Sequence, residues 1–419
     1  MAKLAEGFQT DTPSKSKLSL CMFCDTELGK ETKPEHILLS ALGGRKTTKR
    51  AICSYHNNLF GSTIDQELAG QVPILRNMFQ MESGTGKAAP ALRGLQSGND
   101  RINLCSDGTP ELIAKPFTIT DRGDGTFDLQ VMVRSEEELG QIVPHIAARI
   151  AKTEEEVWNL LAGARATKIS RPAGAIHFPL SFGGTDAIRS IAKSLLVLIA
   201  SKVGTESIRT EALANARKFV LDGSDTFTRT HSSLDSRLLP GVDLLEERFG
   251  PLFNLLYVRS DQAGRTIGYF TLYNLIAWQV VLAESGGPPN LSIGLASNPM
   301  KPADWSDGIA NDIDISLEWL DSPDQTDILA RGQQRMVAAM EHYVQTGRER
   351  EIGRIVDKTL GKYFQPGEHI LDEDRTRVAI AEMADRVTRM LMGIPMEESV
   401  TIKRPDPATS PDGAPAPES

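Results

Sequence analysis

The chain has 419 residues, of which 40% are hydrophobic and 24% are charged, and its formal net charge at pH 7 is −9. This length exceeds what one hydrophobic core usually serves, so we expect two or three domains of an ordinary globular protein. The negative charge counts mildly against tight, non-specific DNA binding unless the basic residues are concentrated locally, because phosphate binding needs positive charge at the contact.

The chain shows no targeting segment. Its first twenty residues lack the apolar stretch of a signal peptide. The most apolar run, SLLVLIA at 194–200, is too short to span a bilayer. We therefore expect a cytoplasmic protein without membrane contact. Three of the four cysteines lie within the first 53 residues, and in a cytosolic chain such clustering favours a bound metal over disulfides.

Shifts in composition divide the chain into five parts. The expected parts are a flexible N-terminus (1–18), a small cysteine-containing module (19–70), a larger α+β domain (71–325), a helical region (326–398) and a disordered, proline-rich tail (399–419). The predicted fold class is therefore α+β.

The first chemical signal in the chain is a pair of short metal-ligand motifs. CMFC places Cys21 and Cys24 two residues apart, and CSYH places Cys53 and His56 at the same spacing. Together they can complete a tetrahedral zinc site, and four protein ligands leave no open position, so this zinc would be structural. The alternatives are a redox pair or buried cysteines. A thioredoxin-like redox motif would lie in a βαβ pattern, which this region lacks.

Further motifs lie between and after these ligands. In chain order the module reads CxxC, EHI, ALGG, CxxH, NN, FG and ID. This order resembles the HNH nucleases of the ββα-metal type, most closely the bacterial subgroup with EHIIP, LGG and CNxxFG segments. The resemblance covers roughly residues 19–68. It implies a zinc-braced module that hydrolyses phosphodiester bonds, in DNA rather than RNA.

The resemblance also implies roles for individual residues. His36 would be the general base, because an imidazole can accept a proton from water at neutral pH. Glu35 would point to the other side of the strand and ligate a divalent cation, Mg²⁺ or Mn²⁺. Asn57, directly after the last zinc ligand, would be the second ligand of that cation, and Asn58 a hydrogen-bonding neighbour.

The match has two departures from the family pattern and one supporting feature. His56 stands where the family more often has a fourth cysteine. The middle Asn of the motif has no counterpart in RKTTKRAIC, so either Thr47 or Thr48 replaces it by hydrogen bonding or the site is slow or inactive. Gly43 and Gly44 would allow a tight turn and a close approach of the backbone to phosphate.

A cluster of basic residues lies beside the predicted site. Arg45, Lys46, Lys49 and Arg50 would bind phosphate there, which would supply locally the positive charge that the whole chain lacks. The alternative is a solvated charged loop, which is what most such runs are.

The remaining elements follow from periodicity and capping signals. Residues 117–133 alternate as a hairpin, and 153–164 begin with a capping signature. A helix runs from 185 to Gly204 with Thr185 as its cap. Residues 253–283 contain further strands, and 326–395 have helical periodicity throughout.

Two functions remain open from the sequence. The first is a metal-dependent endonuclease. Its residues 71–398 would control target choice, oligomer state or activation, and they would form a homo-oligomer or bind a regulatory partner. By analogy alone, bacterial HNH proteins with appended regions suggest a part in defence or mobile-element systems. The second is a catalytically inactive zinc module that binds nucleic acid or protein.

Overall fold

The computed structural model describes residues 19–124, 126–133, 135–164, 166–170, 175–178, 180–364, 368, 370–394 and 396–400. These form two compact units, neither of which is continuous in sequence. The first comprises Met1–Leu92, Cys105–Thr109 and Pro179–Tyr343, and the second Arg93–Leu104, Pro110–Phe178 and Val344–Ser419. The predicted flexible N-terminus and residues 401–419 of the predicted tail lie outside the described residues.

The N-terminal module of the first unit has the expected ββα order. Strand β1 (Glu35–His36) pairs antiparallel with β2 (Thr47–Thr48), and helix α1 (Ser54–Gly61) follows. Two short helices complete the module, α2 (Ile64–Ala69) and α3 (Pro73–Met78).

The first unit also contains a six-stranded antiparallel sheet in the order β10-β13-β12-β11-β14-β15. Its strands are β10 (Ser232–Asp235), β11 (Asn254–Ser260), β12 (Thr266–Leu272), β13 (Ile276–Ala283), β14 (Ser292–Ser297) and β15 (Trp305–Ser306). Every residue of β12 is buried, as expected of a central strand that is covered on both faces. Helices α9 (Val242–Phe249) and α10 (Leu317–Leu320) pack on one face, where Tyr257 and Tyr269 belong to the core.

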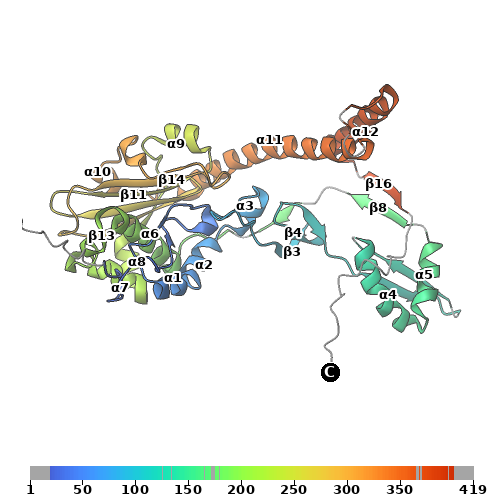
Figure 1. Cartoon of the computed structure of the whole chain (residues 1–419), viewed down its shortest axis with the longest axis horizontal. Helices are drawn as coiled ribbons and strands as arrows, with labels where there is room; N and C mark the ends of the chain where they lie inside the picture. The colour runs from blue at the N-terminus through green and yellow to red at the C-terminus, as the bar shows by residue number, and fades with distance from the viewer. Residues whose placement is uncertain are drawn as a thin grey trace, which may run out of the picture. The chain divides into compact units, whose positions relative to one another are not determined.

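Helix α6 (Thr185–Val203) covers the other face of this sheet (Figure 1). Its approach to β12 is close, since a Cβ on Gly268 would lie 2.4 Å from Leu195 Cδ1. The helix ends before Gly204 as predicted. The prediction that Thr185 caps it is wrong, because Gly184 is the cap and the Thr185 hydroxyl donates to Asp225 at 2.8 Å.

The N-terminal module is attached to this α6–sheet core by side-chain hydrogen bonds and by helix packing. Helix α2 packs against α6. The Gln71 amide donates to Gly183 O at 2.6 Å and accepts from Gly183 N at 3.0 Å. The fully buried Asn254 donates to Leu42 O at 2.9 Å. Two further helices of the unit, α7 (Ala214–Asp222) and α8 (Asp225–His231), follow α6 in the chain.

The second unit begins with small antiparallel sheets. One has the order β5-β4-β3-β9, and the predicted hairpin is confirmed as β6 paired with β7. The strands are β3 (Leu92–Ser97), β4 (Asp100–Leu104), β5 (Pro110–Leu112), β6 (Phe117–Asp121), β7 (Phe127–Val131) and β9 (Ile176–His177). Helices α4 (Glu136–Ile150) and α5 (Glu154–Ala162) share a hydrophobic core with β6 and β7, and the predicted capping box of α5 is present at Thr153.

The predicted helical region consists of two helices with a break between them. Helix α11 (Ile328–Tyr363) begins in the first unit and ends in the second. Helix α12 (Glu373–Met392) begins anew because the Asp372 side chain accepts from Arg375 N and caps it. It is followed by strand β16 (Met396–Val400), which pairs with β8 (Ala166–Ser170). Within the described part of the chain, no helix is both long and apolar enough to cross a membrane.

Candidate functional site

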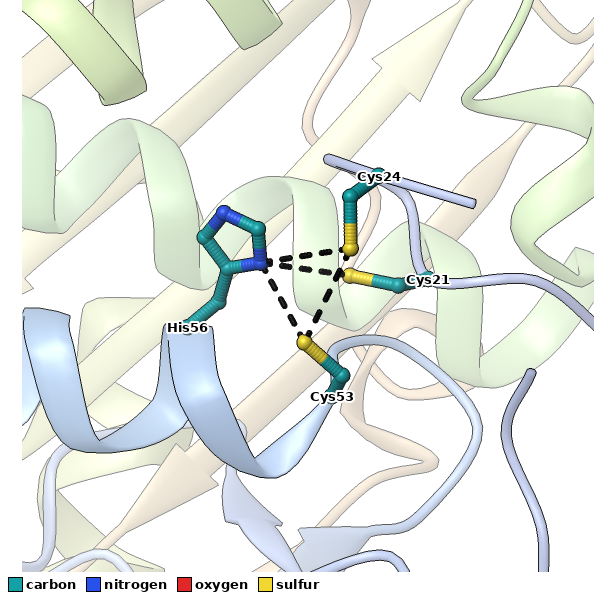
Figure 2. A group of neighbouring side chains, drawn as sticks. All are labelled: Cys21, Cys24, Cys53 and His56. Atoms are coloured by element: carbon teal, nitrogen blue, oxygen red, sulfur yellow. Dashed lines mark hydrogen bonds between the residues drawn. The ribbon is translucent and has the colours of Figure 1, made fainter. Parts of the chain in front are cut away.

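The predicted zinc ligands lie together, with their ligand atoms within 4.8 Å of one another (Figure 2). Cys24 Sγ lies 3.8 Å from Cys53 Sγ, and His56 Nδ1 lies 3.6, 3.7 and 3.3 Å from the sulfurs of Cys21, Cys24 and Cys53. Tetrahedral zinc with ordinary bond lengths requires about 3.8 Å between sulfurs and about 3.6 Å between sulfur and nitrogen. The four residues therefore fit a structural zinc ion.

Local structure explains why these four residues meet. Cys21 and Cys24 lie in a tight turn closed by Cys21 N donating to Thr26 O at 2.8 Å. Cys53 is the cap of α1 and His56 lies in its first turn, so both point to the same side. Burial lowers the pKa of His56, which favours the neutral imidazole that binds zinc.

A side chain from outside the module holds the turn that carries the first two cysteines. Arg209 Nη1 donates to Cys21 O and to Cys24 O, both at 2.6 Å, and its Nη2 pairs with Asp25. Both carbonyls belong to zinc ligands, so Arg209 fixes the backbone from which the thiolates project. Such contacts beyond the ligands commonly tune metal affinity.

The predicted base and its neighbour are consecutive residues of β1, and successive residues of a strand point to opposite faces. The Glu35 side chain is buried, and His36 is partly buried and faces Thr47 in the strand register. Burial lowers the pKa of His36, and the positive charge of Lys193 lowers it further, while Asp65 opposes this. A neutral imidazole near pH 7 is the form that can accept a proton from water.

The Glu35 carboxylate is paired with a buried lysine of α6. Lys193 Nζ lies 2.6 Å from Glu35 Oε1 and 2.7 Å from Asp65 Oδ2, and the Lys193 side chain is 1% exposed. Ser190 Oγ donates to Asp65 Oδ1 at 2.6 Å. Burial alone would lower the pKa of Lys193, but the two carboxylates outweigh it and raise that pKa, so the ammonium stays charged. Burial raises the pKa of Glu35, and the Lys193 charge opposes that rise.

The two asparagines after the last zinc ligand take part in local hydrogen bonds. Asn57 Nδ2 donates to Pro34 O at 3.0 Å, which joins α1 to the residue before β1. Asn58 Oδ1 accepts from Lys33 Nζ at 2.7 Å. Both asparagines therefore lie beside the segment that carries Glu35.

The glycine turn and the threonines of β2 serve the packing of the module. Gly43 has a φ of 92°, and a Cβ on Gly44 would lie 2.0 Å from Leu38 O, so both positions need glycine. Thr48 Oγ1 accepts from Arg50 N at 3.1 Å, while Thr47 is opposite His36 in the register. Thr47 is thus the threonine placed beside the predicted base.

Comparison with known proteins bears on this module. The sequence model of a family described as HNH endonuclease matches residues 21–73, which span the zinc ligands, β1, β2, α1 and α2. Residues 21–73 are an HNH module. No curated protein and no solved structure matches the chain.

The HNH family implies a divalent metal, and the residues at Glu35 do not fit one. The Lys193 ammonium already occupies the carboxylate, and Glu35 is only 6% exposed. Magnesium keeps several of its waters when it binds proteins, so it needs an open carboxylate rather than one buried against a cation. The zinc ligands of the HNH module, in contrast, fit their ion.

The basic cluster of the HNH module is only partly available to phosphate. Lys46 Nζ pairs with Asp307 at 3.3 Å and lies 5.1 Å from the ring centre of Trp305. Lys49 Nζ donates to Lys30 O at 2.6 Å. Arg45 and Arg50 are exposed. The two arginines are therefore the better candidates for phosphate contact.

The sequence analysis did not identify Lys193, Asp65 or Arg209 as site residues. Lys193 interrupts the apolar face of α6, and such a buried charge requires a partner, which is a signal that the sequence carries. Asp65 belongs to the ID motif of the module. Nothing local marks Arg209, because its contacts with the cysteine carbonyls span more than 180 residues of sequence.

Proposed function

We propose that the HNH module hydrolyses phosphodiester bonds, with DNA as substrate and His36 as the general base. The observation that carries this proposal is the position of His36: it lies on β1 of a module that matches the HNH family and that has a complete zinc ligand set. Its lowered pKa supports the role, because a neutral imidazole is ready to accept a proton.

In the proposed reaction, the strand fixes the base and the exposed basic side chains hold the substrate. His36 takes a proton from the attacking water as the new P–O bond forms and the bond to the 3′ oxygen breaks, and the leaving 3′ oxygen takes a proton from solvent water. Arg45 and Arg50 bind the flanking phosphates, since guanidinium groups match phosphate oxygens in charge and geometry. Zinc supplies the stability of the scaffold.

The contacts of Glu35 and Asn57 do not fit the predicted Mg²⁺ or Mn²⁺ ion. Glu35 is paired with Lys193, and the Asn57 amide donates to Pro34 O. The proposed hydrolysis therefore does not depend on that ion.

A specific observation favours the second candidate, a zinc module that binds nucleic acid without cutting it. The carboxylate beside the predicted base is buried and neutralised by an internal cation. The zinc scaffold and the exposed arginines would serve binding equally well in the absence of catalysis.

A plasmid assay separates the two candidates. Supercoiled DNA is incubated with wild-type protein, with His36→Ala and with His145→Ala, in Mg²⁺, in Mn²⁺ and without added divalent metal. His145 is an exposed histidine of α4 and serves as the matched control. We expect nicked or linear DNA from wild type and His145→Ala, and a loss of about 10²-fold or more in rate for His36→Ala.

The binding-module candidate makes the opposite forecast. All three proteins would shift the plasmid in a gel without cutting it under any condition. Equal cutting by wild type and His36→Ala would instead remove His36 as the base.

A further inference from the structure

Three charged groups far apart in sequence meet inside the first unit. Glu35 comes from β1, Asp65 from α2 and Lys193 from the middle of α6. The ammonium lies 2.6 and 2.7 Å from the two carboxylates, and Ser190 donates to the free side of Asp65. Lys193 is therefore held by the HNH module from two sides, as a metal ion would be by two carboxylate ligands.

The fold keeps this lysine in place. Helix α6 packs against β11, β12 and β14 of the sheet and also against α2. The residues that flank Lys193, Ala192 and Ser194, are 0% and 2% exposed. The Lys193 side chain is itself 1% exposed and its ammonium contacts both carboxylates, so its charge is enclosed within the unit next to Glu35.

We propose that the Lys193 ammonium takes the place of the divalent cation that the HNH family implies at Glu35. The assignment deepens the proposed function, on which it rests for the role of His36. Lys193 is a positioning residue: it fixes the Glu35 side of β1 and thereby the strand that carries His36. A second cation on Glu35 would lie next to this ammonium, where like charges repel.

A Mn²⁺-binding experiment tests the assignment. The full-length, zinc-loaded protein is titrated with Mn²⁺ in the absence of DNA, and electron paramagnetic resonance measures the concentration of the free ion. Wild type and Glu35→Gln should bind the same number of ions. Lys193→Gln should bind one more than wild type, and the double variant Lys193→Gln/Glu35→Gln should lose that ion. Lys202→Gln, on the same helix but partly exposed and paired with Asp307, is the matched control and should gain none.

One Mn²⁺ ion bound by wild type and lost in Glu35→Gln would overturn the assignment, as would Lys193→Gln gaining no ion while keeping its zinc. If Lys193→Gln does not fold, the comparison of wild type with Glu35→Gln decides alone. Failure of the proposed function is distinguishable, because it is read from plasmid cleavage. A protein that cuts no DNA but shows the expected Mn²⁺ pattern would contradict the nuclease proposal and support the role of Lys193.

Discussion

Arg209 and Lys193 show how side chains outside the HNH module complete it. Arg209 binds the carbonyls of the first two zinc ligands, and Lys193 binds the carboxylate beside the predicted base. Neither residue lies in the matched segment 21–73. The properties of the zinc site and of β1 therefore depend on groups contributed by the α6 region of the chain.

Replacing Arg209 by Ala should weaken zinc binding. The carbonyls of Cys21 and Cys24 would lose a charged donor at 2.6 Å, so the turn would hold its thiolates less firmly. By analogy with other residues that support metal ligands, we expect zinc affinity to fall about 10- to 100-fold. Competition with a chromophoric chelator measures this, and Arg248→Ala, which removes an exposed ion pair with Asp312, is the control. Unchanged affinity in Arg209→Ala would contradict a supporting role.

The pH dependence of cleavage should reflect the lowered pKa of His36. Only the neutral imidazole can accept the proton. Because burial and Lys193 lower the pKa of His36 from its ordinary 6.5, the base stays neutral as the pH falls through 6.5. The acid limb of kcat/KM should therefore lie below pH 6.5, and a limb at or above 6.5 would contradict the assignment.

For individual residues, the sequence predicts those parts of the site that depend on short spacings along the chain. The ligands Cys21, Cys24, Cys53 and His56 were predictable because zinc requires residue types that two local motifs supply. The environment of Glu35 was not predictable. Its partner Lys193 is 158 residues away, and only the packing of α6 against α2 brings the two together.

Among the helices, local capping signals predict some boundaries and tertiary contacts decide others. The capping box at Thr153 involves only neighbours in sequence, so the start of α5 was predicted correctly. At α6, Thr185 has the residue type of a cap, but its hydroxyl bonds Asp225 of α8 instead. The start of α12 depends on a local cap, as the start of α5 does, because the Asp372 side chain accepts from Arg375 N three residues further on.

The pairing of α11 with α12 should weaken when Glu382 loses its charge. Glu382 accepts from Lys362 Nζ at 2.6 Å, Tyr363 OH at 2.8 Å and Arg386 Nε at 2.7 Å, and these contacts lower its pKa from 4.5 to about 2. The stabilisation is present above pH 4.5 and is lost as the pH falls towards 2. The Lys362–Glu382 pair is partly exposed, so we expect Glu382→Gln to cost only about 0.5–1 kcal/mol at neutral pH.

Hydrogen exchange of the α12 amides, measured by mass spectrometry, detects a weaker pairing of α11 with α12. Exchange should accelerate in Glu382→Gln at neutral pH. Glu373→Gln, which removes an exposed pair with Arg377 in the same helix, is the control and should leave exchange unchanged. Equal exchange in both variants would mean that the Glu382 contacts contribute nothing to the pairing.

For the whole molecule, the HNH module is part of a larger core. Its helix α2 packs on α6. The carbonyl of Leu42 accepts a hydrogen bond from the buried Asn254, and Glu35 of β1 forms an ion pair with Lys193. The sequence indicates a separable module because the motifs end near residue 70. It does not indicate this attachment, since the attaching residues lie more than 100 positions further along the chain.

A fragment of residues 1–92 should therefore bind zinc and yet remain incompletely folded. Zinc contributes on the order of 10 kcal/mol to the folding free energy of small zinc modules. The turn that carries Cys21 and Cys24 and the first turn of α1 should therefore form around the ion. Helix α2 should not form, because Ile64 and Leu68, each 1% exposed in the chain, would face water, and Asp65 would lose Lys193. Elemental analysis should give one zinc, while the α2 amides exchange rapidly.

Co-expression with residues 93–419 should slow that exchange by restoring α6 beside α2. An isolated fragment with protected α2 amides would show that the module folds without α6. The attachment through Lys193 would then be dispensable for the fold. The Lys193–Glu35 ion pair would then matter only because it neutralises the charge of Glu35. The comparison of Mn²⁺ binding by wild type and by Glu35→Gln tests that effect directly.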